Sequence, residues 1–222
     1  MSNFFKWQNI SAPAKLAEGD IHIYALNLVS NDDSLFKLLN PDEQAQALRF
    51  VFAKDKTRYI QTRGRLRLLC GHCLDKDPAQ IEFSYNANGK PYIINSALKF
   101  NVSHSHEKAL YIFTWNREVG IDVEYMGRHH DLPAIAQRFF SSEEQALLAQ
   151  VDPSNYVKAF YTIWTRKEAY IKAKGVGLSQ ALDSFAVNIS EPAKFLRLPP
   201  GENWFLENVA LDGPYCGACV VK

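Results

Sequence analysis

The sequence lacks the features that mark membrane-spanning and exported proteins. Nowhere in its 222 residues is there an uninterrupted apolar run of the roughly 18 residues needed to cross a bilayer. The opening segment, MSNFFKWQNISAPAK, has no long apolar stretch and no signal-peptide architecture. We therefore expect a cytoplasmic protein without a membrane partner.

The sequence also has almost no net charge. Twenty-five Lys and Arg against 24 Asp and Glu leave a formal charge of +1, so the overall charge indicates no nucleic-acid or membrane partner, and we expect neither. It contains neither a P-loop nor a GxGxxG fingerprint, so the usual nucleotide-binding modes are not supported. Any charge signal must therefore be local.

Cysteine is scarce, with four residues in two pairs, CGHC at 70–73 and CGAC at 216–219. A thioredoxin-like motif should follow a strand and open a helix, whereas CGHC stands near the end of a predicted long helix. If YCGACVV is a strand, Cys216 and Cys219 face opposite sides, which serves a shared zinc site poorly. We favour buried, reduced structural cysteines and keep a structural zinc protein as an alternative.

The remaining pattern predicts an α+β protein. A hydrophobic content of 47% allows a substantial core in one large domain or two small ones. Strands are predicted at 20–29, 81–85, 90–94, 98–104, 109–115 and 117–125, and helices at 53–74, in DLPAIAQRFF, in SSEEQALLAQ and in the segment that ends at Gly175. Strand, long helix and strands are followed by much the same order again, which indicates two similar halves meeting near residue 116.

Two carboxylates mark the segment GIDVE. Asp122 and Glu124 alternate with apolar residues, so in a strand they share one face, about 7 Å apart. A solvent-exposed strand face would explain them. We keep a metal site as the alternative, because Gly120 permits close backbone approach and the flanking residues are apolar.

The segment WTRKEAYIKAKG places charges on one side of a helix. Glu168 and Lys172 stand four residues apart and share a face with Trp164. A surface ion pair worth roughly 0.3–0.5 kcal/mol is the simpler explanation. Lys167, Lys172 and Lys174 also gather near the helix end, where cations are mildly favoured.

FNVSHSH and a basic run offer candidate anion ligands. On a strand His104 and His106 would face one way and the serines the other, which suits a metal, a phosphate or a plain polar strand end. The basic run from Arg49 to Arg67 is mostly a solvated surface, from which one or two members could reach an anion. Lys90 after Gly89 adds a flexible turn where backbone could meet phosphate.

The order and spacing of these segments resemble one family. GKP, FNVSHS, GIDVE, RFFSSEE and FYTIWTRKEAYIKAKGVGLS, between about Pro41 and Phe185, resemble the 4′-phosphopantetheinyl transferases of the surfactin-synthetase type. The resemblance implies transfer of the phosphopantetheine arm of coenzyme A to a serine of an acyl or peptidyl carrier protein, with release of adenosine 3′,5′-bisphosphate. It also implies a pseudo-dimer of two α+β halves, 1–116 and 117–222, each with a small antiparallel sheet on a long helix, and coenzyme A in the cleft between them.

The resemblance assigns roles to single residues. Asp122, Glu124 and Glu168 match the magnesium-binding acids, and Glu168 also matches the proposed general base. Lys172 matches the lysine that contacts the pyrophosphate. The other residues matched to coenzyme A contacts are Ser103, His104, Gly89, Lys90 and, with a less certain role, Lys167.

One segment departs from the family pattern. PDEQAQALRF has Glu43 and Gln46 where a cation for the 3′-phosphate is expected. The 3′-phosphate would then depend on Lys90, His104 and an arginine such as Arg58 or Arg63. Two other functions stay open, a non-catalytic coenzyme A or nucleotide-binding module and a divalent-metal phosphohydrolase. Because two internal halves would make one complete cleft, a monomer is expected.

Overall fold

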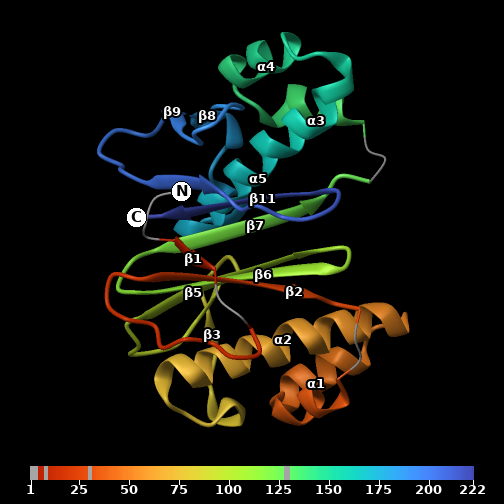
Figure 1. The fold of residues 1–222 in the computed structure, drawn as a ribbon, viewed down its shortest axis with the longest axis vertical. Coiled ribbons are helices and arrows are strands. Elements are labelled where there is room, and N and C mark those ends of the chain that lie inside the picture. The colour runs from red at the N-terminus through yellow and green to blue at the C-terminus, as the bar shows by residue number, and fades with distance from the viewer. Residues whose placement is uncertain (1–4, 8–9, 30–31, 128–130) are drawn as a thin grey trace. The chain divides into compact units, whose positions relative to one another are not determined.

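The computed structural model describes residues 5–7, 10–29, 32–127 and 131–222 (Figure 1). The chain divides into two compact units. We call Ser2–Tyr85 with Pro91–Asn116 the N-terminal unit, and Arg117–Lys222 with Asn86–Lys90 the C-terminal unit. The short segment Asn86–Lys90 thus belongs to the C-terminal unit, although it comes before residue 117, where the rest of that unit begins.

The N-terminal unit contains a four-stranded sheet. Its order is β1 (Phe5–Trp7), β2 (Ile21–Asn27), β6 (Lys108–Trp115) and β5 (Leu98–Ser105). The β2, β6 and β5 strands pair antiparallel, whereas β1 runs parallel to β2, so this sheet is mixed rather than purely antiparallel.

The long helix α2 (Ala53–Leu74) packs on this sheet, within the bounds predicted from the sequence. Leu66, Leu69 and Cys70 of the helix share one hydrophobic cluster with aromatic side chains of the strands. The hydroxyl of Tyr111 donates a hydrogen bond to the Thr62 carbonyl at 3.1 Å. The helix is therefore held by apolar burial, which supplies most helical stability in proteins.

Shorter elements complete the N-terminal unit: the 3₁₀ turns η1 (Asp33–Leu38) and η2 (Pro78–Gln80), helix α1 (Pro41–Leu48) and the hairpin strands β3 (Ser84–Tyr85) and β4 (Pro91–Tyr92). The Asn40 side chain caps α1 by accepting a hydrogen bond from the Glu43 backbone amide at 2.9 Å. The Glu43 carboxylate accepts one from the Asn40 backbone amide at 3.0 Å. The strands predicted at 81–85 and 90–94 are real but shorter than expected.

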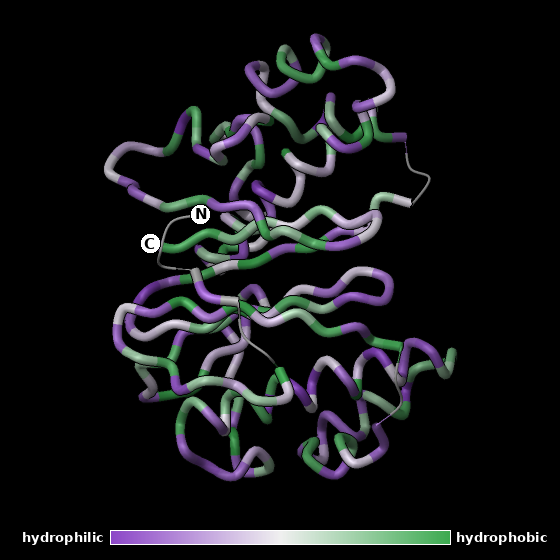
Figure 2. The backbone as a smooth tube through the Cα atoms, viewed as in Figure 1, coloured by the Kyte–Doolittle hydropathy of each residue, from purple (hydrophilic) through white to green (hydrophobic). Residues whose placement is uncertain are grey.

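The C-terminal unit contains a three-stranded antiparallel sheet in the order β10 (Phe205–Asn208), β11 (Tyr215–Val221) and β7 (Val119–Tyr125). Hydrophobic residues run along these strands (Figure 2). The register pairs Cys216 with Glu124 and Ala218 with Asp122. A small hairpin, β8 (Ala186–Val187) with β9 (Phe195–Arg197), is separate from this sheet.

Helix α5 (Tyr156–Lys174) packs on this sheet and is the second long helix predicted from the sequence. Ile163, Ala169 and Tyr170 join Ala218 and Val220 of β11 in one core cluster. The remaining elements of the unit are α3 (Leu132–Phe139), α4 (Ser142–Ala149), η3 (Pro153–Asn155), η4 (Gly177–Ser179) and η5 (Leu182–Ser184). The α+β fold class, with a small sheet and a long helix in each unit, is confirmed.

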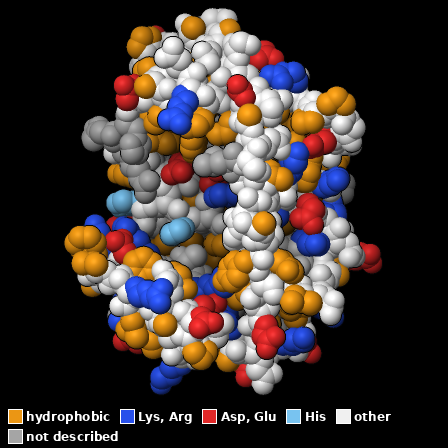
Figure 3. Space-filling model, turned by 180° about the vertical axis from the view of Figure 1, so that it is seen from behind, with side chains coloured by type: hydrophobic (Ala, Val, Ile, Leu, Met, Phe, Trp, Pro, Cys, Tyr) orange, Lys and Arg blue, Asp and Glu red, His pale blue; other side chains and the backbone are white. Residues whose placement is uncertain are grey.

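The surface carries charges of both signs. Figure 3 shows acidic and basic side chains interspersed over the face in view, in agreement with the net charge of +1. Within the described ranges, no helix combines the length and the apolar character that a bilayer crossing requires.

Candidate active site

Strand β7 presents its two acids toward helix α5. Gly120, Asp122 and Glu124 share one face of the strand because side chains alternate. A Cβ added to Gly120 would lie 2.1 Å from the Ala169 carbonyl oxygen, so strand and helix backbones touch there. The face that carries the acids is therefore the face that α5 covers, and a glycine is needed for that approach.

Helix α5 presents Glu168 and Lys172 one turn apart, next to this contact. Each of the two precedes an alanine, Ala169 or Ala173, that lies against Gly120. The close approach of the backbones thus brings both charged residues of the helix near the acidic strand. The ion pair that Lys172 forms is with Asp122 of the strand.

The ammonium group of Lys172 neutralises Asp122. Lys172 Nζ donates to Asp122 Oδ1 at 2.6 Å. Asp122 is 2% exposed, whereas the Lys172 side chain is 29% exposed. A buried carboxylate requires such a partner, because removing a charge from water without compensation is costly.

Glu168 responds to the same charges. Its pKa is raised to about 7, chiefly by burial and next by the Asp122 charge, while Lys172 opposes the shift and Glu124 adds to it. The acids from strand and helix are therefore close enough to oppose one another's ionisation. The joint role of Asp122, Glu124 and Glu168 as metal ligands stays a prediction.

The donor set fits a hard divalent cation in its chemistry. All three candidate ligands offer carboxylate oxygens, which Mg²⁺ prefers. A bound cation would also reduce the electrostatic repulsion between these negative charges. In the described part of the chain, no group of three or more His, Cys, Asp or Glu side chains is gathered around one point. Lys172 is the cation that Asp122 contacts here.

Lys167 is a structural residue, which corrects its predicted role as a coenzyme A contact. Its side chain is 0% exposed, and its ammonium donates to both carboxylate oxygens of Glu144 at 2.7 Å and to the Phe185 carbonyl at 2.9 Å. Those three bonds use the three N–H donors of a lysine. Burial lowers the pKa of Lys167, with the Glu144 charge acting against that shift. The sequence motif correctly placed Lys167 on the helix, but it did not show that the partner of Lys167 is Glu144.

The turn at Asn86–Lys90 adopts the geometry that its glycine suggests. Gly89 has φ of +81°, a left-handed conformation that favours glycine. The Lys90 ammonium donates to the backbone carbonyls of Ala173 and Val119 at 2.8 and 3.1 Å. The predicted coenzyme A contact of Gly89 and Lys90 stays a prediction, and Lys90 has an additional role within the unit.

Ser103 and His104 lie on β5, in the N-terminal unit. Ser103 is buried, and His104 is exposed. His106 is not on the strand, since it lies in the following turn with φ of +53°. His104 and His106 therefore do not share a strand face as predicted. The assignment of Ser103 and His104 to phosphate stays a prediction.

Arg63 does not fit its predicted role as a 3′-phosphate ligand. Its Nε donates to Glu43, another guanidinium nitrogen donates to the Tyr85 hydroxyl, and its side chain is 12% exposed. Glu43 also accepts from the fully buried Arg67 at 2.6 Å. Glu43 is thus the buried anchor of two arginines rather than a missing cation. Arg58, which lies 3.5 Å from Asp55 and is more exposed, stays a prediction.

Sequence reasoning missed the partners that hold these residues in place. Glu144, which binds Lys167, was visible only as the third residue after a capping serine, Ser141. Asn86 and Asn88 were assigned to a turn, and their bonds to Gly175 could not be foreseen. The only local signals were a helix-ending glycine and a turn rich in asparagine.

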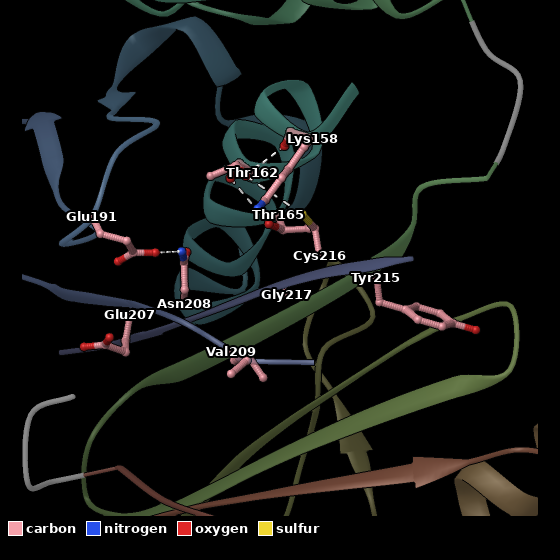
Figure 4. A pocket seen from close by; sticks show the side chains of 11 residues that line it. Lys158, Thr162, Thr165, Glu191, Glu207, Asn208, Val209, Tyr215, Cys216 and Gly217 are labelled. Atoms are coloured by element: carbon pink, nitrogen blue, oxygen red, sulfur yellow. Dashed lines mark hydrogen bonds between the residues drawn. The ribbon is translucent and has the colours of Figure 1, made fainter. Parts of the chain in front are cut away.

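The four cysteines are free thiols; Cys70 and Cys219 are buried, as the favoured interpretation predicted, whereas Cys73 and Cys216 are only half-buried. Burial raises the pKa of Cys73 to about 12, which makes it a poor nucleophile near neutral pH. Cys216 lines a cavity of about 380 Å³ together with Thr162, Thr165 and Asn208 (Figure 4). None of the predicted site residues lines this cavity.

Comparison with known proteins gives consistent matches along the chain. Residues 118–219 match the model of the 4′-phosphopantetheinyl transferase superfamily, and residues 30–112 match the model described as 4′-phosphopantetheinyl transferase, N-terminal. The chain is 36% identical over 214 residues to the 4′-phosphopantetheinyl transferase HetI of Nostoc sp., covering 93% of this chain and 89% of that protein.

Two Bacillus proteins show similar agreement. The 4′-phosphopantetheinyl transferase psf-1 of Bacillus pumilus is 35% identical, over 87% of this chain and 86% of its own length. The 4′-phosphopantetheinyl transferase Sfp of Bacillus subtilis is 31% identical, over 83% of this chain and 82% of its own. Because relatives above 30% identity span most of the sequence, the chain belongs to the 4′-phosphopantetheinyl transferase superfamily and is an enzyme of the Sfp-like type.

Proposed function

We propose that the protein uses Mg²⁺ to transfer the 4′-phosphopantetheine arm of coenzyme A to a serine of an acyl or peptidyl carrier protein, releasing adenosine 3′,5′-bisphosphate. The observation that supports this most strongly is the cluster on β7 and α5. There a buried aspartate bound to Lys172 lies close to a glutamate whose pKa is raised to about 7. Membership of the transferase family supplies the reaction class.

Asp122, Glu124 and Glu168 would hold the magnesium ion. When bound there, the ion would supply Lewis-acid chemistry that offsets negative charge on the phosphates of the substrate. The protein contributes the placing of the three acids on two packed elements and the burial that strengthens electrostatic interactions. Phosphoryl-type transfers depend mainly on such positioning and charge stabilisation.

Glu168 is the proposed general base. Its raised pKa of about 7 suits a carboxylate that must accept a proton near neutral pH. An oxygen of Glu168 would accept the proton of the carrier serine as the hydroxyl attacks the β-phosphorus. The bond from that phosphorus to the bridging oxygen breaks, and adenosine 3′,5′-bisphosphate leaves.

Lys172 is the proposed stabiliser of the leaving group. Its ammonium lies 2.6 Å from Asp122 Oδ1, and its side chain is 29% exposed. A partly exposed, flexible lysine can turn toward a pyrophosphate while remaining near the acids. There it would offset the charge that develops on the departing oxygen.

The finer aspects of the function are proposals of the same kind. Gly89, Lys90, Ser103, His104 and Arg58 are the proposed coenzyme A contacts. We also propose a cytoplasmic location, where free thiols stay reduced, a monomeric state, and no nucleic-acid or membrane partner. The four free cysteines support the location.

The test is incubation of the purified protein with coenzyme A, Mg²⁺ and an apo carrier protein, followed by mass spectrometry of the carrier. We expect the carrier to gain the mass of the phosphopantetheine arm on one serine, and we expect a chelator to abolish the gain. A carrier variant with alanine at that serine is the matched control. Coenzyme A cleavage without carrier modification would instead indicate a phosphohydrolase, and binding without either reaction would indicate a non-catalytic module.

A further inference from the structure

The segment Asn86–Lys90 forms a turn that is internally fixed. The Asn86 side-chain oxygen accepts from the backbone amides of Asn88 and Lys90, both at 2.9 Å. The backbone amide of Asn86 donates to the backbone carbonyl of Lys90 at 3.0 Å, and the backbone amide of Gly89 donates to the backbone carbonyl of Asn86 at 3.0 Å. Asparagine side chains stabilise turns in this way. The orientation of the Asn86 side-chain amide is therefore fixed by hydrogen bonds within the turn.

This turn binds the C-terminal end of α5. Gly175 ends the helix with φ of +66°, and its carbonyl oxygen accepts from the Asn86 side chain at 2.7 Å and the Asn88 side chain at 3.0 Å. A Cβ at Gly175 would lie 2.8 Å from Asn86 Nδ2 and 3.0 Å from the Lys90 side chain. The glycine is thus needed both for its backbone conformation and for the fit of the turn.

Lys90 links the helix to the acidic strand. Its ammonium donates to the carbonyl of Ala173 in the last turn of α5 at 2.8 Å and to the carbonyl of Val119, the first residue of β7, at 3.1 Å. Glu118 Oε2 lies 3.4 Å away. Carbonyls in the last helical turn lack partners inside the helix, and a cation is favoured at that end.

The linked residues are neighbours of the proposed catalytic groups. Ala173 follows Lys172 directly, and Val119 stands three residues before Asp122. Between these points Gly120 lies against the helix backbone, with its missing Cβ position 2.3 Å from the Ala173 amide nitrogen. A shift of the helix end would therefore move Lys172 relative to Asp122.

We propose that the Asn86–Lys90 turn is a positioning element, in which Lys90 and Asn86 fix the helix α5 against β7 and so place Lys172 and Glu168 against Asp122. This inference rests on the proposed transferase function. It differs from the role that the resemblance gives Lys90, because a substrate contact acts on coenzyme A affinity whereas a positioning residue acts on turnover.

Lys90→Met separates these two roles, since it keeps the chain length and removes the charge. We expect kcat to fall at least about tenfold, because small displacements of reacting groups are costly, while KM for coenzyme A changes less than about threefold. The loss should be the same with 3′-dephospho-coenzyme A as donor. A raised KM for coenzyme A only, with kcat preserved, would assign Lys90 to the 3′-phosphate and overturn the positioning role.

Asn86→Ala is the second variant and carries no change in charge. Both variants should show faster amide hydrogen exchange than the wild type at the end of α5 and the start of β7, measured without substrates by mass spectrometry. Lys194→Met, at an exposed lysine of the same unit, is the control. Exchange equal to wild type in both variants would overturn the inference. A wild type that fails to modify the carrier would overturn the proposed function, while the exchange data would still judge the positioning role.

Discussion

At the residue scale, Asp122 acts on both Glu168 and Lys172 through its negative charge. The buried Asp122 carboxylate holds the Lys172 ammonium at 2.6 Å and helps to raise the Glu168 pKa to about 7. One aspartate therefore gives two neighbours opposite tendencies, since it attracts the cation and opposes ionisation of the second acid. A divalent ion in the cluster would change both interactions at once.

Replacing Glu168 should separate turnover from binding. In Glu168→Gln we expect kcat to fall at least about a hundredfold, because general-base catalysis contributes about that much or more. Coenzyme A affinity should stay within a few-fold, since the amide keeps the size of the side chain. Single-turnover transfer and calorimetric titration measure the two quantities. Glu82→Gln, at an exposed glutamate, is the control. Equal losses in both measurements would argue against a specific catalytic role.

Replacing Lys172 should leave the buried carboxylate of Asp122 without the ammonium group that neutralises it. In Lys172→Met without metal, we expect a loss of roughly 1–3 kcal/mol in the free energy of unfolding, because a buried carboxylate loses its counter-ion. Urea denaturation with a chelator measures this, and added Mg²⁺ should restore more stability to the variant than to the wild type. Lys158→Met, at an exposed lysine of the same helix, is the control. A variant as stable as the wild type, with no larger response to Mg²⁺, would contradict this account.

At the scale of elements, α5 is held along its length by different means. Near its middle, Lys167 forms a buried ion pair with Glu144 of α4. At its C-terminal end, the Asn86–Lys90 turn binds Gly175 and Ala173. Glu144 also accepts from the amide of Val187 in β8 at 2.9 Å, so one carboxylate joins three elements. The helix that carries the proposed catalytic groups is thus fixed by polar contacts as well as by its apolar face.

Breaking the buried pair should destabilise the protein strongly. In Lys167→Met we expect a loss of about 3–5 kcal/mol in unfolding free energy, because Glu144 would remain buried without its cation. The double variant Lys167→Met with Glu144→Leu should recover part of that loss, since neither charge is then buried. Denaturant titrations of both variants, with Lys194→Met as control, measure this. A single variant that loses less than about 1 kcal/mol would show that the pair contributes little.

At the scale of the whole molecule, local patterns predicted the elements well and their partners poorly. The helices over 53–74 and up to Gly175 were predicted from the local sequence, and the terminal glycine of the second helix is such a local signal. The acids of β7 were found from strand alternation. We propose that the two units correspond to the domains predicted at 1–116 and 117–222, with the Asn86–Lys90 turn as the exception.

The roles that were assigned wrongly depend on residues far apart in the sequence. The resemblance of its motif placed Lys167 at coenzyme A, but Glu144, 23 residues away, binds its ammonium group. Arg63 was expected at a phosphate, but Glu43, 20 residues away, holds it. Which cation pairs with which acid is decided by tertiary packing, and a single sequence carries no local sign of that choice.

The contact at Gly120 limits how this enzyme could be redesigned. A methyl group there would lie 2.1 Å from a carbonyl oxygen of the helix backbone, which no rotation of a side chain relieves. Any larger residue at this position would have to push strand β7 and helix α5 apart, and Asp122 would then separate from Lys172.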